Sequence, residues 1–372
     1  MKESVENKTP GLFNLRGKAR MPDIDNAETA ETLKKSEIIR ERVFYLDFIR
    51  AISICLIIIF HFDRHASDLN ISDNPIFGTD FELLGRIGVS LFIILSGASL
   101  MLNTRERFDV KKFYKKRFFS IYPLFWVAYA TTFLCLFLLS RHLPPNHHPA
   151  TILLTIMGLD GFLLFAIPNY YLLGEWFIGF ILIFYVTFPL LRYLLLRYRL
   201  FTLLSCFFIA LLITLFYDLE MSILRFPPSR LMEFALGMCF IYYFSTSHKI
   251  RNLLFFGMAV LLFSLTMTFN IPLLFEVAMQ GVSVFLGLAI ISVFFENASF
   301  GRIIRFLSAY SFGAFLIHHV MLIQILSFFV GQQLRPFYSY LLFSSILLVI
   351  YGLSFLLTNV NAFVLRKIGV YT

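Results

Sequence analysis

The chain has 372 residues, a formal net charge of +9 and a mean hydropathy of +0.77, and 58% of its residues are hydrophobic. Apolar runs recur nearly to the end of the chain. No water-soluble core could bury that much apolar surface, which excludes a soluble globular protein. The runs do not alternate apolar and polar residues, which excludes a porin-like barrel. The positive charge does not indicate nucleic-acid binding, because Lys and Arg are enriched in the cytoplasmic loops of membrane proteins. We expect an all-α, polytopic membrane protein.

The chain begins with a polar segment, residues 1–42, of mixed charge and without sustained periodicity. This composition predicts a disordered cytoplasmic tail. We place the membrane domain at residues 43–360 and a short cytoplasmic tail at residues 361–372. The four cysteines all fall within apolar runs and form no CxxC pair, so we expect neither disulfides nor a cysteine metal site.

The first apolar run, Val43 to Phe62, holds two ionisable residues, Arg50 and His61. Eleven residues at about 100° each come to about three turns, which places both side chains on one helix face, roughly 16 Å apart along the axis. Ionisable residues inside a membrane helix are costly and usually functional. We interpret the pair as the two ends of a reaction path.

The basic loops predict the orientation of the following spans, because Lys and Arg concentrate on the cytoplasmic side. The segment 105–117 carries seven basic residues and is placed inside. The segment 151–167 is short, and if it crossed the membrane, Arg192, Arg197 and Arg199 would lie outside. We therefore predict that it is interfacial or re-entrant. Ten spans result, with both termini cytoplasmic, Arg50 toward the inner side and His61 near the outer one: 43–62, 86–103, 119–139, 171–191, 200–217, 231–246, 252–268, 273–295, 306–330 and 338–360.

Six motifs follow one another along these spans. They are FYLDFIRAISICLIIIFHF with the Arg-x10-His pair, GVSLFIILSG at Gly88–Gly97, RFFSIYPLFW at Arg117–Trp126, EWFIGFILIFYVTFP at Glu175–Pro189, SRLMEFALGM at Ser229–Met238 and SAYSFGAFLIHH at Ser308–His319. In this order they resemble the membrane-bound acyltransferase family 3. The resemblance implies an integral-membrane O-acyltransferase of the cell membrane, plasma or inner, in the stand-alone form without a fused extracytoplasmic hydrolase-like domain.

The resemblance also implies the substrates. Acyl-CoA, acetyl-CoA above all, would be the cytoplasmic co-substrate, and a hydroxyl of an envelope sugar or glycolipid would be the acceptor, with no permanently bound cofactor. Three positions depart from the family pattern. Ser120 replaces the second arginine of an Arg-x-x-Arg pair, Ser90 replaces a common Asp, and Ile181–Leu182 replaces an acidic pair. The missing arginine bears on how the donor is bound.

Acyl transfer needs a base, and His61 suits that role because an unperturbed imidazole has a pKa of about 6.5. The alternative is a histidine that anchors the helix at the interface. Arg50 and Arg117 suit donor phosphates, since a guanidinium pairs well with phosphate. The alternatives are an Asp47–Arg50 ion pair for Arg50 and an ordinary basic residue of the cytoplasmic side for Arg117.

Later spans supply further candidates. His318 matches the histidine of its motif and is expected to contact donor or substrate, the alternative being a buried histidine satisfied by a backbone carbonyl. His318 and His319 point about 100° apart, so we expect at most one to face His61. Glu175, Trp176, Arg230 and Glu233 are expected to line an acceptor cleft, although an aromatic belt explains Trp176 equally well. No metal site is expected, and His142, His147 and His148 have no acidic or cysteine partner.

Two other functions fit parts of the pattern. An exporter of a glycan or lipid-linked sugar also carries intramembrane charges and broken helices. No inverted repeat relates the two halves of the chain, which weakens that option. A structural scaffold would leave Arg50 and His61 unexplained.

Overall fold

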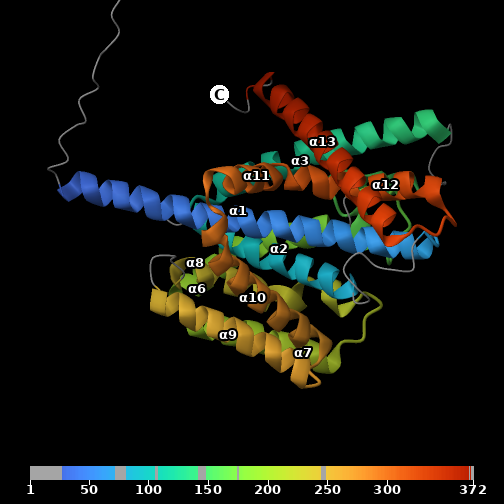
Figure 1. Cartoon of the computed structure of the whole chain (residues 1–372). Helices are drawn as coiled ribbons and strands as arrows, with labels where there is room; N and C mark the ends of the chain where they lie inside the picture. The colour runs from blue at the N-terminus through green and yellow to red at the C-terminus, as the bar shows by residue number, and fades with distance from the viewer. Residues whose placement is uncertain are drawn as a thin grey trace, which may run out of the picture. The chain divides into compact units, whose positions relative to one another are not determined.

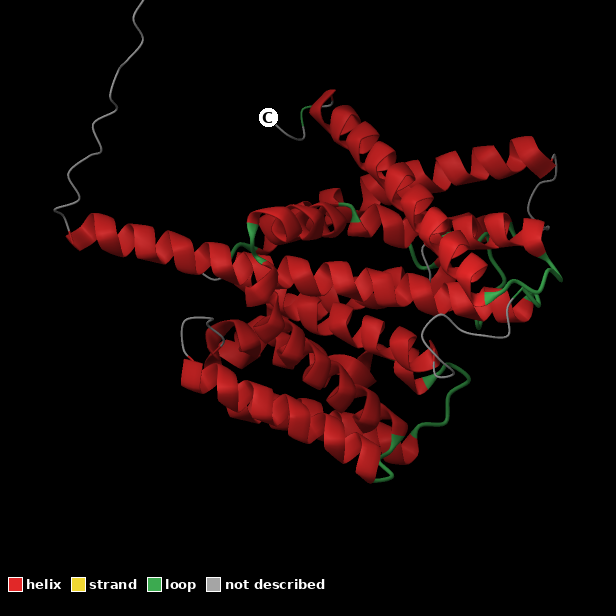
Figure 2. Ribbon diagram, in the orientation of Figure 1, coloured by secondary structure: helices red, strands yellow, loops and turns green. Residues whose placement is uncertain are grey.

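The computed structural model describes residues 27–71, 81–104, 108–140, 148–173, 176–243, 249–367 and 369. In this part of the chain every regular element is a helix (Figure 2). The chain divides into two units, Met1–Arg40 and Glu41–Thr372. Of the first unit the structure describes only a helical stretch from Ala27 onward, and everything that follows concerns the second unit. The tail boundary at residue 42 stays a prediction.

Eleven long helices make up most of this structure (Figure 1). Their bounds are α1 Ala27–Asp68, α2 Phe81–Asn103, α3 Val110–Ser140, α6 Phe177–Arg197, α7 Arg199–Phe216, α8 Leu231–Tyr243, α9 Lys249–Thr268, α10 Leu273–Ile291, α11 Ala298–Ala309, α12 Ser311–Leu326 and α13 Pro336–Lys367. The short elements are η1 Pro149–Thr151, α4 Ile152–Met157, α5 Asp160–Leu163, η2 Ile223–Arg225, η3 Pro227–Arg230, η4 Ser292–Phe295 and η5 Ser327–Phe329.

Nine helical segments of the described residues are long and apolar enough to cross a membrane, which confirms an all-α, multi-pass membrane protein. They correspond to nine of the ten predicted spans. The segments are Phe44–Asp68, Phe81–Asn103, Val110–Leu138, Phe177–Arg197, Arg199–Phe216, Arg251–Thr268, Leu273–Phe295, Ser311–Phe329 and Pro336–Lys367.

The remaining predicted span, 231–246, coincides with α8, which has 13 residues. A helix of that length covers about 20 Å, less than the roughly 30 Å of a bilayer core. The last residues of the predicted span, 244–246, lie outside the described part of the chain. At its other end η3 precedes α8 directly and lengthens the ordered segment.

α2 and α8 run side by side with their backbones in contact. A Cβ atom on Gly97 would lie 2.2 Å from the carbonyl oxygen of Phe234, and one on Gly237 would lie 2.0 Å from that of Ile94. Small residues permit this close approach between membrane helices. Ser90 of α2 contacts Arg230, which directly precedes α8, and Gly97 meets Phe234 further along both helices, so the two helices run in the same direction. The predicted ten-span topology also requires α2 and α8, its second and sixth spans, to run in the same direction across the membrane.

The segment 151–167 forms two short helices, α4 of six residues and α5 of four. They are separated by Gly158, whose φ of +71° lies in the left-handed region that glycine adopts without strain. Neither helix is long enough to cross a bilayer core, and the interfacial or re-entrant placement of the segment stays a prediction. Side chains of α3 hold α4 in place, because Trp126 Nε1 donates to the Ile156 carbonyl and Tyr122 Oη to the Met157 carbonyl, both at 3.0 Å.

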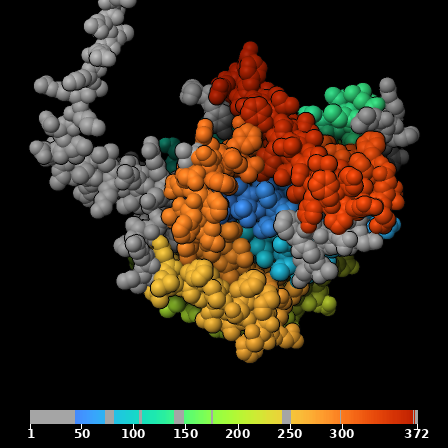
Figure 3. Space-filling model, viewed as in Figure 1, coloured from blue at the N-terminus to red at the C-terminus, as the bar shows by residue number. Residues whose placement is uncertain are grey.

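α1 is enclosed by helices from both halves of the second unit. Phe44, Phe48 and Ala51 pack against Ile304 of α11, whereas Tyr45 and Leu46 belong to a buried cluster shared with α2, α8 and α10. In the space-filling view only short stretches of α1 (blue) and α2 (cyan) are visible between the orange and red C-terminal segments (Figure 3). Arg50 and His61, both partly buried on α1, therefore face the protein interior.

Candidate active site

Arg50 projects from α1 into a network of polar side chains. Its Nη1 donates to Asp47 Oδ1 and to Ser308 Oγ, both at 3.0 Å, and its Nη2 to Ser99 Oγ at 3.4 Å. Ser308 Oγ in turn donates to Asp47 Oδ1 at 2.7 Å. The Asp47–Arg50 ion pair considered from the sequence is present, and it leaves the guanidinium at the edge of a cavity. The structural and the binding interpretation of Arg50 are thus compatible.

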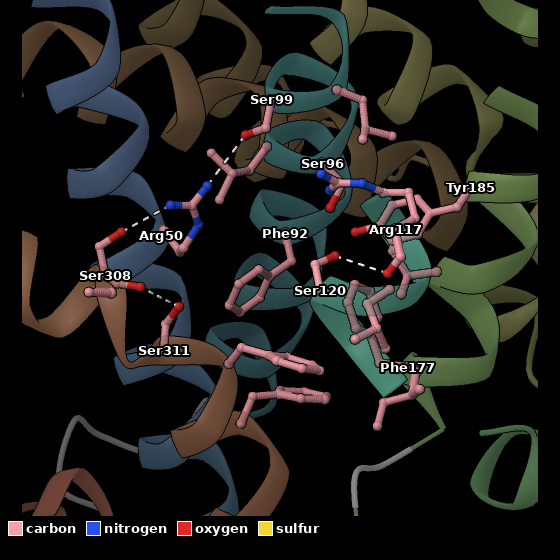
Figure 4. A pocket seen from close by; sticks show the side chains of 18 residues that line it. Arg50, Phe92, Ser96, Ser99, Arg117, Ser120, Phe177, Tyr185, Ser308 and Ser311 are labelled. Atoms are coloured by element: carbon pink, nitrogen blue, oxygen red, sulfur yellow. Dashed lines mark hydrogen bonds between the residues drawn. The ribbon is translucent and has the colours of Figure 1, made fainter. Parts of the chain in front are cut away.

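A cavity of about 410 Å³ lies beside Arg50, and we call it the arginine cavity. Arg50 and Arg117 approach it from opposite sides, from α1 and α3 (Figure 4). Five serines also line it: Ser96, Ser99, Ser120, Ser308 and Ser311. Two guanidinium groups among hydroxyl donors form a site suited to an anion with several oxygens, such as a phosphate group.

Arg117 is well placed to bind a ligand from this cavity. Its Nε is buried and has no hydrogen-bond partner among the described residues, and its guanidinium carbon lies 6.0 Å from the ring centre of Tyr185. Ser120 does not replace the missing family arginine, because its hydroxyl donates to the Arg117 carbonyl at 3.0 Å. Among the described residues, the arginines that line the arginine cavity are therefore Arg50 and Arg117.

His61 lines a second cavity of about 440 Å³, which we call the histidine cavity. Its other ionisable and polar lining residues are Arg64, His65, Glu82, Arg86, Trp176, Ser222, Arg225, Arg230 and His319. Arg64 and Arg86 both pair with Glu82, at 3.4 Å and 2.9 Å. The Arg225 guanidinium carbon lies 5.3 Å from the ring centre of Trp176. This cavity offers a base together with hydrogen-bond donors, as an acceptor hydroxyl requires.

Both histidines of α12 face His61, and the expectation that at most one would do so is wrong. The ring centres of His318 and His319 each lie 5.1 Å from that of His61. The His61 ring lies between the directions of two successive α12 side chains, and the sequence of α12 alone does not reveal that placement. His65, one turn after His61, completes a group of four imidazoles, 4.8 Å from His319 and 6.3 Å from His61 between ring centres.

His318 is fully buried, and its Nδ1 donates to the Phe315 carbonyl at 2.7 Å. This is the carbonyl-satisfied arrangement weighed from the sequence. It leaves Nε2 as the unprotonated nitrogen, which has no hydrogen-bond partner in the part of the chain that the structure describes. His318 does not line the arginine cavity, so a direct role in donor binding stays a prediction.

Arg230 and Glu233 form an ion pair in the interior, each with a side chain 1% exposed. Arg230 donates to both carboxylate oxygens of Glu233, to Ser90 Oγ at 2.6 Å and to the Leu224 carbonyl at 3.3 Å. Each charge is thus matched by protein partners, and the pair supports the packing of α8 on α2. Arg230 also lines the histidine cavity, as predicted, whereas Glu233 does not. Trp176 does line the histidine cavity, and Glu175 lies outside the described residues.

Three phenylalanine rings line the arginine cavity on the side of His318 and Trp176, and we call them the aromatic wall. Phe92, Phe177 and Phe315 all line the arginine cavity, with ring centres 6.0, 6.4 and 5.9 Å apart in pairs. Behind them Phe315 lies 5.7 Å from the His318 ring and Phe177 lies 5.9 Å from the Trp176 ring. The aromatic wall thus connects the lining of the arginine cavity to Trp176, which lines the histidine cavity.

Sequence reasoning missed several residues of the histidine cavity, His65 and Arg225 among them. The spacing of His65, four residues after His61 on a helix, is a signal that could have revealed it. Arg225 lies in η2 between two spans, and nothing in its local sequence marks it as a cavity residue.

A family model described as "Acyltransferase domain" matches residues 43–359, which is most of the chain and nearly the predicted membrane domain. No curated protein and no solved structure matches the chain. The match covers both residues of the Arg50–His61 pair and every helix that lines the two cavities. The chain therefore belongs to the membrane-bound acyltransferase family 3 and is a multi-pass membrane acyltransferase.

Proposed function

We propose that the protein transfers an acyl group, acetyl in the first place, from cytoplasmic acyl-CoA to a hydroxyl of a cell-surface sugar or glycolipid. The observation that carries this proposal is the division of the site. One cavity presents two guanidinium groups and the other presents His61, and a ring of the aromatic wall contacts Trp176 of the second cavity. The positive loops of the sequence orient the arginine cavity toward the cytoplasm, where acyl-CoA is made.

The arginine cavity binds the donor in this proposal. Arg50 and Arg117 contact phosphate oxygens of the donor, and the serines supply hydroxyls for its amide groups. Arg50 keeps its position through Asp47 and Ser308, so that its free edge stays directed at the cavity. Because α1 is continuous from Arg50 to His61, the acyl thioester has to extend about 16 Å along the helix to reach the histidine.

His61 acts as the general base. It accepts the proton of the acceptor hydroxyl while that oxygen bonds to the thioester carbonyl carbon. The carbon–sulfur bond then breaks, the acyl group stays on the acceptor oxygen, and the proton passes from His61 to the leaving sulfur, so that CoA departs as a thiol. Residues of the histidine cavity, Trp176 and Arg225 among them, position the acceptor.

The test replaces His61 with Gln and Arg50 with Gln in separate strains and measures acyl groups on isolated surface glycans by mass spectrometry. Both variants are expected to lose acylation, because one removes the base and the other weakens donor binding. His148→Gln is the matched control, since His148 lines neither cavity. Wild-type levels of acylation in a well-expressed His61→Gln strain would sink the mechanism. An exporter would give surface glycans with no acyl mass in every strain.

A further inference from the structure

Three histidines of the histidine cavity form a cluster with the geometry of a metal site. His61 and His65 lie one turn apart on α1, and His319 reaches them from α12. Each offers one ring nitrogen, and the three nitrogens all lie within 4.8 Å of one another. Two histidines four residues apart on a helix present their rings on one face, where they can hold one ion together.

The donor set suits a transition-metal cation of the zinc class. Imidazole nitrogen binds zinc at about 2.0–2.1 Å, which places tetrahedral ligands about 3.3 Å from one another. Rings whose nitrogens are within 4.8 Å reach that spacing by small side-chain rotations. Three histidines with one position left for water are also a known pattern of zinc ligation. The ligands open into a cavity of about 440 Å³, which leaves room for that water and a path for the ion.

The second observation is the state of His65. Its Nε2 is buried and has no hydrogen-bond partner among the residues that the structure describes. An unpaired buried imidazole nitrogen is unfavourable unless something binds it. The charges around the cluster do not prevent a cation from binding. Three carboxylates offset three of the four arginines of this cavity, because Arg64 pairs with Asp68 and Glu82, Arg86 with Glu82 and Arg230 with Glu233. The guanidinium of the fourth, Arg225, lies against the Trp176 ring.

We propose that His61, His65 and His319 bind a divalent zinc-class cation and that this ion inhibits the enzyme. A metal bound to His61 occupies the lone pair with which the imidazole would accept the acceptor's proton. The binding half of the proposal rests on the cluster alone, whereas the inhibition half rests on the proposed function of His61. The sequence expectation of no metal site had weighed only the histidines at 142, 147 and 148 and the cysteines.

Cobalt(II) tests the binding half, because its visible absorption bands report low-coordinate nitrogen ligation. The full chain, purified in detergent, is titrated with Co²⁺ and then with Zn²⁺. We expect one Co²⁺ per chain, with bands that Zn²⁺ abolishes. His65→Gln is expected to weaken binding by roughly a hundredfold or more, since loss of a supporting group alone costs 10- to 100-fold. His148→Gln is the matched control and should bind as the wild type does.

Absence of stoichiometric Co²⁺ bands in the wild type, or unchanged bands in a monodisperse His65→Gln protein, would overturn the site. The inhibition half is tested by the ratio of acyl transfer with and without Zn²⁺ in each variant. We expect this ratio to fall in the wild type and to move toward one in His65→Gln. Bound zinc with unchanged turnover would refute inhibition alone. A wild type without acyl transfer under any condition would refute the proposed function and leave the Co²⁺ result standing.

Discussion

Arg230 and Glu233 illustrate how a pair of charges is used inside a membrane protein. Each side chain is 1% exposed, and the guanidinium also reaches Ser90 on α2. Ser90 and Gly281 are packed so closely that a Cβ on Gly281 would lie 2.3 Å from the Ser90 Cβ. The polar contacts therefore tie α8 to α2 at a point where α10 also touches them. This arrangement predicts a role in stability.

We expect Glu233→Gln to destabilise the protein by about 3–5 kcal/mol, because it leaves the Arg230 charge buried without its carboxylate partner. The measurement is the midpoint of thermal unfolding in detergent. The double replacement Arg230→Met with Glu233→Leu removes both charges and should recover much of that loss. Equal unfolding midpoints for wild type and Glu233→Gln would contradict the structural role.

Asp160 at the start of α5 lies outside the spanning segments, and burial raises the pKa of its carboxyl group to about 6. Its Oδ1 accepts from the Gly161 amide at 2.9 Å, while Oδ2 has no hydrogen-bond partner in the described part of the chain. A raised pKa means that the folded state retains the proton up to about pH 6, whereas the unfolded chain releases it near pH 3.8. Stability due to this group is therefore lost as the pH rises through that window.

Asp160→Asn should remove this penalty. Above pH 6 the variant is expected to be more stable than the wild type by an amount on the order of 3 kcal/mol, because a shift of one pKa unit corresponds to about 1.36 kcal/mol. Near pH 4 the difference should vanish, since the wild-type carboxyl is then protonated in the folded state as well. Unfolding midpoints at pH 4 and pH 8 check this. A constant difference at both pH values would contradict the assignment to this carboxyl.

Single site residues were predictable from sequence to different degrees. Arg50 and His61 stand out because charged side chains are rare in membrane helices and their spacing places them on one face. The protein partners of Arg230 could not be read in the same way. Ser90 lies 140 positions away, and a buried ion pair and a ligand contact use the same residue types.

At the scale of helices, the aromatic wall brings together rings from α2, α6 and α12. In the proposed reaction the acyl group passes from the arginine cavity to the histidine cavity beside these rings, which makes the passage selective. A short acyl group needs a smaller displacement of the rings than a long one does. The wall therefore favours a short donor such as acetyl, in agreement with the donor that the family resemblance implies.

Phe92→Ala is expected to widen the acyl range. One methylene in an apolar passage is worth roughly 10- to 200-fold in discrimination, so the butyryl-to-acetyl ratio should rise by about tenfold or more. The measurement is a competition between the two donors, followed by mass analysis of the acylated acceptor. Phe188→Ala is the matched control, because Phe188 is buried in α6 but lines neither cavity. An unchanged ratio in a stable Phe92→Ala protein would contradict the sieving role.

Helix boundaries were predicted well where apolar runs end in charges and less well where the chain breaks inside a run. The predicted span 306–330 is two helices, since α11 ends at Ala309 and α12 begins at Ser311. Tyr310 breaks the helix between them without a proline or a glycine, so the sequence carries no conventional signal there. The predicted start at residue 171 was also early, because α6 begins at Phe177. A hydropathy profile averages over a window of residues, so a break of one residue within an apolar run does not appear in it.

On the scale of the whole molecule, the sequence predicted a helical bundle, and the cavities emerged only from its assembly. Residues 50, 96, 117, 178 and 308 line one cavity although they belong to five separate helices or the turns beside them. Their convergence depends on how the helices pack, and packing between helices in lipid follows from small residues and polar contacts. Apolar periodicity identifies the buried face of each helix but does not say which helix packs against that face.

The ten-span topology predicts the side of the membrane on which each loop lies. For the loops after α8, that side depends on whether α8 crosses the membrane. In a background without the native cysteines, Asp218→Cys and Asn270→Cys should react with a membrane-impermeant maleimide applied from outside. Arg199→Cys should react only after permeabilisation, because it belongs to the cytoplasmic side. If α8 did not carry the chain across, Asn270→Cys would behave like Arg199→Cys. Labelling of intact and permeabilised cells separates the two outcomes.

α1 joins Arg50 to His61 through an uninterrupted hydrogen-bonded backbone. A helix of this kind neither stretches nor shortens during turnover, so the interval between the two residues is a fixed gauge of about 16 Å. In the proposed reaction the donor has to match that interval in length. A thioester on a truncated arm would retain its reactive carbon and yet remain out of reach of the base. The length of the carrier, as much as its charge, then decides which activated acyl compounds the enzyme accepts.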